Sequence, residues 1–85
     1  MKYIFVDESW EDYLYWQKTD KKIVKKINEL IKDISRNPFS GIGKSEALKH
    51  KYKGFWSRRI TDEHRLIYRV KEDEVWIAKC RYHYD

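Results

Sequence analysis

The chain has 85 residues, a formal net charge of +5 and a sequence pI of about 9.3, so it attracts polyanions such as RNA, DNA or acidic proteins. Charged residues make up 39% of the chain and aromatic residues 16%, in an interspersed pattern that fits a folded domain better than a disordered one and favours a single domain over residues 1–85. We expect a cytoplasmic protein without a membrane anchor, because no apolar run approaches the roughly 20 residues of a spanning helix and the single cysteine, Cys80, excludes an internal disulfide.

A short strand and an aromatic helix are predicted first. Residues 3–6 are aromatic and β-branched, which is typical of a strand. Asp7, Glu8 and Ser9 are N-cap candidates for a helix that continues to about Thr19. The face of this helix is strongly aromatic, and it carries Trp10, Tyr13, Leu14 and Trp16.

A second helix is predicted over residues 21–36, with its cap supplied by the pair Thr19-Asp20. Its apolar residues fall at helical spacing, which predicts one face packed on the core and a basic, solvated back. These residues are Ile23, Ile27, Leu30, Ile31 and Ile34. The helix ends before Pro38, because a residue that precedes proline avoids the helical region.

Three further strands are predicted after a glycine-containing loop at residues 39–44, and residues 46–48 are a candidate for an additional short strand. The three strands cover residues 55–60, 65–70 and 75–82, with hairpin connections at 61–64 and 71–74. The order β-α-α-β-β-β predicts an α+β fold, in which two N-terminal helices pack on one face of a small antiparallel β-sheet.

The alternation of side chains assigns the strand charges to faces of this sheet. Matching the apolar sides turns four residues of the last strand toward the helices: Trp76, Ala78, Cys80 and Tyr82. Arg65, Arg81 and His83 then share the opposite face, and Arg59 joins them. We expect this face to be open, because burying several arginines together is costly. Arg58 falls on the inward side, where the sequence gives no reason for an arginine.

A set of motifs along the chain resembles the YoeB/Txe toxins of the RelE superfamily. The matching segments are residues 9–17 and 25–33, Gly41-x-Gly43-Lys44-x-Glu46-x-Leu48-Lys49, and residues 54–60, 63–66 and 80–84. They follow the family's order over essentially the whole chain, without a gap. The resemblance implies a RelE-like fold and a type II toxin that pairs with a YefM-like antitoxin. It also implies a homodimer that inhibits translation by cleaving messenger RNA in the ribosomal decoding site.

The resemblance also implies roles for individual residues. Glu46 would be the general base, Arg65 would bind the scissile phosphate, and His83 would be the general acid with Tyr84 beside it. Four residues are expected to contact the phosphate or the RNA backbone: Lys49, His50, Arg59 and Arg81. The sequence departs from the family at Ser45 and Ala47, where proline is frequent, and at Asp85, which extends the chain past the tyrosine that ends many relatives.

Such a site would act without a metal ion or another cofactor. A base removes the 2′-hydroxyl proton, an acid protonates the 5′-oxygen, and arginine stabilises the charge on phosphorus. His50, His64 and His83 lack the spacing of shared metal ligands, and Cys80 is a single thiol.

Two other interpretations remain open at this stage. The same basic face could belong to a noncatalytic RNA- or ribosome-binding module, or to an interaction domain whose partner is acidic. Each candidate also has a purely structural interpretation: Glu46 as a loop carboxylate, Arg65 as a surface charge and His83 as a terminal surface histidine.

Overall fold

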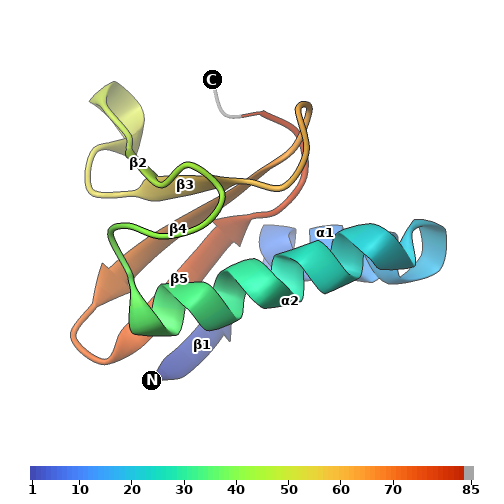
Figure 1. The fold of residues 1–85 in the computed structure, drawn as a ribbon, viewed down its shortest axis with the longest axis horizontal. Helices are drawn as coiled ribbons and strands as arrows, with labels where there is room; N and C mark the ends of the chain where they lie inside the picture. Colours follow the sequence, from blue (N-terminus) through green and yellow to red (C-terminus); the bar gives the residue numbers. More distant parts are fainter. Residues whose placement is uncertain (84–85) are drawn as a thin grey trace.

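The computed structural model describes residues 1–83, in which a five-stranded sheet packs against two helices (Figure 1). The elements in chain order are β1 (Lys2–Phe5), α1 (Asp7–Thr19), α2 (Lys21–Arg36), β2 (Glu46–Ala47), the 3-10 helix η1 (His50–Tyr52), β3 (Trp56–Arg59), β4 (Arg65–Lys71) and β5 (Glu74–Lys79). The predicted α+β class and element order are confirmed. No helix in the described part of the chain has the length and apolar character needed to cross a membrane.

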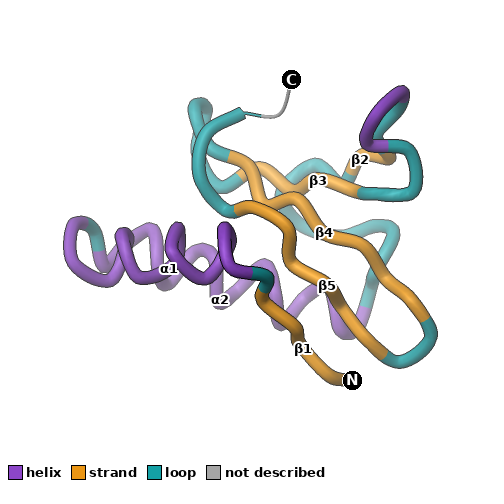
Figure 2. Tube along the Cα trace, turned by 180° about the vertical axis from the view of Figure 1, so that it is seen from behind, coloured by secondary structure: helices purple, strands orange, loops and turns teal. Residues whose placement is uncertain are grey.

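The strands lie in the order β1-β5-β4-β3-β2, with β1 and β2 at the two edges (Figure 2). The pairs β2–β3, β3–β4 and β4–β5 are antiparallel, as the sequence predicts. In contrast, β1 runs parallel to β5, with Phe5 opposite Ile77, so the sheet is mixed. The helices and the other strands all separate β1 from β5 in sequence, and a parallel pair requires such a long connection.

The apolar face of α2 packs against the middle of the sheet. Ile27, Leu30 and Ile34 are completely buried and belong to the same core cluster as Leu66 and Tyr68 of β4. Helical spacing therefore identified the buried face of α2 correctly. The core also receives Trp16 from α1, so both helices cover the same face of the sheet.

The two helices begin in different ways. Asp20 caps α2 as predicted, because its carboxylate accepts hydrogen bonds from the backbone N–H groups of Lys22 and Ile23. The predicted cap of α1 is wrong: Val6 occupies the N-cap position and makes no side-chain cap. Ser9 is instead completely buried, and its hydroxyl lies 2.6 Å from the carbonyl oxygen of Ile77, which joins α1 to β5.

A bulge interrupts the pairing of β4 with β5. Tyr68 lies opposite Ile77, whereas the preceding Ile67 lies opposite Lys79. Ala78 is therefore an extra residue in β5, and the alternation of side chains is shifted by one position beyond it.

This bulge corrects the predicted faces of the last strand. Val75 and Ile77 are completely buried in the core, whereas Trp76 is exposed and Ala78 is only partly covered. Beyond the bulge the inward side is reset, so Cys80 is buried as predicted. The prediction assumed that side chains alternate without interruption from Trp76 to Cys80, and this assumption was wrong.

Candidate functional site

Alternate residues of β3 point to opposite faces of the sheet. Arg58 is completely buried on the side of the helices, so Ser57 and Arg59 lie on the other side. Glu46 is paired with Ser57, and Arg65 is paired with Arg59. Paired residues share a face, so Glu46, Ser57, Arg59 and Arg65 lie together on what we call the outer face. The predicted placement of Arg59 and Arg65 away from the helices is confirmed.

Arg65 is nevertheless buried, with only 8% of its surface exposed, and the expectation of an open face is wrong at this residue. Its Nη1 donates hydrogen bonds to the backbone carbonyls of Thr61, Asp62 and His64, at 2.7, 3.1 and 3.1 Å. These carbonyl dipoles offset the cost of burying the positive charge. The β3–β4 hairpin thus holds the guanidinium in a fixed place on the outer face.

Arg59 is more accessible, with 40% of its side chain exposed. Its Nη1 lies 3.6 Å from the carboxylate of Asp62. Its Nε is buried and has no acceptor among residues 1–83. A buried N–H group without an acceptor is unfavourable. The exposed part of the Arg59 side chain is what an anion can reach.

Glu46 opens a short segment that borders a cleft at the edge of the sheet. The segment is anchored by Leu48, which is buried and whose N–H donates to the carbonyl of Phe55 at 2.9 Å. Lys49 and His50 are exposed and line the same cleft as Glu46. The structure therefore places three of the predicted site residues around one concave surface.

The C-terminal segment approaches this face at the start of β4. The backbone N–H of Arg65 donates to the carbonyl of Tyr82 at 3.0 Å, so His83 lies one residue beyond a direct contact with Arg65. His83 is exposed. The predicted catalytic residue Tyr84 and the extension Asp85 lie outside the described residues.

Arg81 does not share the outer face with Arg65, which corrects the prediction. Its guanidinium carbon lies 3.5 Å from the centre of the Tyr15 ring and 4.6 Å from that of Tyr82, so it stacks against α1. The predicted alternation failed here because β5 ends at Lys79, so Arg81 lies beyond the strand in which side chains alternate.

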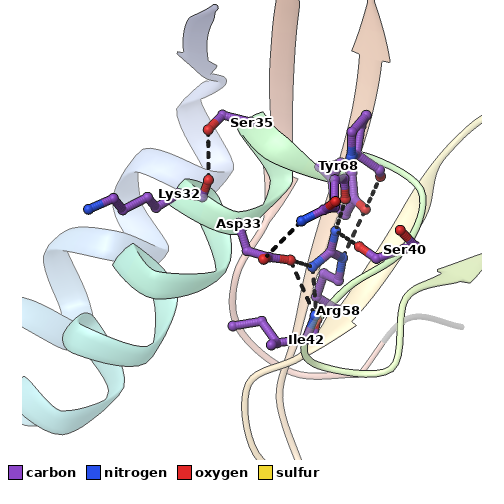
Figure 3. A network of polar contacts seen from close by, with 9 residues as sticks. Lys32, Asp33, Ser35, Ser40, Ile42, Arg58 and Tyr68 are labelled. Carbon is purple, nitrogen blue, oxygen red and sulfur yellow. Dashed lines mark hydrogen bonds and ion pairs between the residues drawn. The ribbon is translucent and has the colours of Figure 1, made fainter.

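The inward-pointing Arg58, which the sequence left unexplained, holds the glycine loop that leads to Glu46 (Figure 3). Its Nη1 donates to Asp33 and to the carbonyl of Ile42, and its Nε donates to the hydroxyl of Tyr68. Its Nη2 donates to the carbonyls of Asn37 and Ser40. All the N–H-bearing nitrogens of the guanidinium are thus used, which is what a buried arginine requires.

The loop fits this network only with glycine at two positions. Gly41 has φ +104°, and a β-carbon there would collide with the carboxylate of Asp33. Gly43 has φ +81°, and its carbonyl accepts a 2.6 Å hydrogen bond from the N–H of Arg59. Arg58 therefore fixes the loop through its side chain, and Arg59 fixes it through its backbone. The feature of the sequence that could have indicated this network is an arginine at an inward-facing position of a strand.

Among residues 1–83, no three His, Cys, Asp or Glu side chains lie close enough together to hold a metal ion. The outer face instead combines the carboxylate of Glu46 with the guanidinium groups of Arg59 and Arg65. Such an arrangement suits a negatively charged ligand and proton transfer to or from it.

Residues 5–84 match the family described as the YoeB-like toxin of bacterial type II toxin-antitoxin systems. Toxin YoeB of Escherichia coli strain K12 is 69% identical over 84 residues, which cover 99% of this chain and 100% of that protein. Toxin RelK of Mycobacterium tuberculosis is 54% identical over 80 residues, with 94% of each chain covered.

Solved structures give the same result. The YoeB/ParE toxin from Agrobacterium tumefaciens superposes with a TM-score of 0.97 at 49% identity, covering 99% of this chain and 100% of that chain. YoeB in the heterotetrameric YoeB-YefM complex from Staphylococcus aureus has a TM-score of 0.92 at 52% identity, with 99% and 98% covered. YafQ from E. coli, at 17% identity and a TM-score of 0.78, shares the fold alone. The chain therefore belongs to the YoeB-like toxins of bacterial type II toxin-antitoxin systems.

Proposed function

We propose that this toxin is a ribosome-dependent endoribonuclease, which inhibits translation in the cytoplasm by cleaving messenger RNA in the decoding site. The supporting observation is the shared outer face of Glu46, Arg59 and Arg65, with His83 one residue beyond the carbonyl that Arg65 binds. This arrangement supports the proposal that the base, the cations and the acid act on one phosphate.

The reaction we propose is an attack of the 2′-hydroxyl on the adjacent phosphorus without a metal ion. Glu46 takes the hydroxyl proton, and His83, with Tyr84 beside it, protonates the departing 5′-oxygen. Arg65 stabilises the charge on phosphorus through its fixed guanidinium. The products are a 2′,3′-cyclic phosphate and a 5′-hydroxyl end.

Lys49, His50 and Arg59 are proposed to hold the RNA backbone. Lys49 and His50 are exposed beside Glu46, and 40% of the Arg59 side chain is exposed. The ribosome would align the RNA for attack, and such alignment supplies a large part of the rate enhancement.

The test is to map the RNA ends produced when purified toxin is added to translating ribosomes. We expect 5′-hydroxyl and 2′,3′-cyclic or 3′-phosphate ends. Glu46→Ala and His83→Ala should each lower the cleavage rate by roughly 10²–10⁴-fold. Glu29→Ala, which changes an exposed carboxylate on α2, is the matched control and should cleave like the wild type.

A noncatalytic RNA- or ribosome-binding module remains the second candidate, because Arg59 and Arg65 lie on the outer face and Lys49 and His50 are exposed beside Glu46. It predicts that the Glu46 and His83 variants still arrest growth while Arg65→Ala only weakens ribosome binding. Ends with a 5′-phosphate would also contradict the proposed mechanism.

We also propose that the toxin forms a homodimer and binds a YefM-like antitoxin. The S. aureus relatives were solved as a YoeB dimer and as a YoeB-YefM heterotetramer. The net charge of +5 favours an acidic partner. Light scattering of the toxin alone and with a YefM protein measures both states. A toxin that stays monomeric and does not bind YefM would contradict both proposals.

A further inference from the structure

We propose that His64 is a positioning residue, which places His83 by holding the backbone of Tyr82. Nδ1 of His64 accepts a hydrogen bond from the Tyr82 N–H at 2.7 Å. The neighbouring Arg65 N–H donates to the Tyr82 carbonyl at 3.0 Å. Two consecutive residues of β4 and its hairpin thus bind both backbone polar groups of one residue, directly before His83.

The imidazole that makes this contact cannot easily move. His64 is only 8% exposed, and its ring meets the buried ring of Trp16 edge to face, with centroids 4.7 Å apart at 76°. Trp16 is held in turn by a 2.8 Å hydrogen bond from Nε1 to the carbonyl of Cys80. The two hydrogen bonds to the Tyr82 backbone, which we call the clamp on Tyr82, are therefore part of the contact between α1 and the chain that follows β5.

The hydrogen bond also defines the tautomer of His64. Nδ1 can accept from the Tyr82 N–H only if it carries no proton itself, so the proton of the neutral ring is on Nε2. Nε2 lies 3.7 Å from the carboxylate of Glu63, which favours that tautomer.

Tyr82 needs such a clamp because its backbone is in the left-handed region, with φ +66°. A residue with a β-carbon adopts this conformation only at a cost in free energy, which other contacts must offset. Here the two hydrogen bonds offset it. The left-handed turn changes the direction of the chain after β5, and it carries His83 to the start of β4.

The catalytic consequence rests on the proposed role of His83 as general acid. Proton transfer requires the donor within hydrogen-bond distance of the leaving oxygen, and a displacement of about 1 Å can lower the rate by about 10²-fold. His64 does not reach the substrate in this proposal. It acts on the rate only through the position of His83.

The test compares His64→Asn with His64→Gln. The side-chain amide of asparagine places its oxygen near the position of Nδ1, so it can accept from Tyr82, whereas glutamine places its polar group near Nε2. Single-turnover cleavage on messenger-programmed ribosomes then separates the maximal rate from the toxin concentration at half-saturation. We expect His64→Gln to lower the maximal rate by about 10²-fold with half-saturation unchanged, and His64→Asn to restore most of it.

Amide hydrogen exchange of Tyr82 in the free toxin gives a readout that does not depend on cleavage. Exchange of the Tyr82 amide should be faster in His64→Gln than in wild type and His64→Asn. The melting temperatures of the folded variants are a separate control for overall stability. Equal rate losses in both variants, or full activity in His64→Gln despite fast exchange, would overturn the positioning role. Full activity of His83→Ala would instead refute the proposed function, on which this role depends.

Discussion

The guanidinium of Arg58 lies 2.7 Å from the carboxylate of Asp33, measured from Nη1 to Oδ2, and this ion pair joins β3 to α2 beneath the glycine loop (Figure 3). The Arg58 side chain is fully buried and that of Asp33 is 19% exposed. Removing one partner of a buried ion pair is strongly destabilising, because the other charge is then buried without a partner.

Arg58→Met is therefore expected to lower the free energy of unfolding by about 3 kcal/mol, because Asp33 and the loop carbonyls lose their donor. Urea unfolding followed by tryptophan fluorescence measures this change. Arg36→Met, at the exposed end of α2, is the control and should change stability by less than about 0.5 kcal/mol. An Arg58→Met protein as stable as wild type would show that the network does not hold the loop.

Asp33 should make stability depend on pH in the acid range. The hydrogen bond from Arg58 lowers the pKa of Asp33, so the unfolded chain binds the proton more tightly than the native protein. The resulting stabilisation is complete above the ordinary aspartate pKa of about 3.9 and is lost as the pH falls through the lower native value. Unfolding free energies of the wild type and Asp33→Asn should therefore converge as the pH falls below the ordinary aspartate pKa and through the lower native value. A difference that stays constant would contradict this role.

Cys80 should be unreactive while the protein is folded. Burial raises the pKa of its thiol to about 12, and the nearby carboxylate of Asp12 adds to this effect. At pH 8 this lowers the thiolate fraction by about 10³-fold relative to an ordinary thiol. Ellman's reagent should release no colour from native toxin and one equivalent after denaturation. Rapid reaction of the folded protein would refute the assignment.

The stacking of Arg81 predicts that its substitution affects stability more than RNA binding. Arg81→Ala should lower the unfolding free energy by about 1 kcal/mol through the loss of contact with Tyr15. The salt dependence of binding to single-stranded RNA should be unchanged. Arg59→Ala should reduce that slope by about 0.7, the value of one phosphate contact. An equal reduction of the slope in Arg81→Ala would show that Arg81 contacts the RNA after all.

The predicted site was recovered in part. Pairing of β3 with β4 brings Arg59 and Arg65 together, as alternation in two uninterrupted strands requires. Alternation failed in β5, where the extra residue Ala78 puts Trp76 on the face opposite to the predicted one. It also failed beyond the end of the strand, where Arg81 stacks against α1. A bulge depends on the partner strand, so no local pattern reveals it.

The sequence by itself determined the features that arise between near neighbours: the apolar stripe of α2, the Asp20 cap and the end of α2 before Pro38. Through its resemblance to known toxins it also indicated the family. Only the tertiary structure decided the parallel pairing of β1 with β5, the burial of Arg58 and the clamp of His64 on Tyr82. These features join residues distant in sequence, and their free energy exists only once the whole chain has packed.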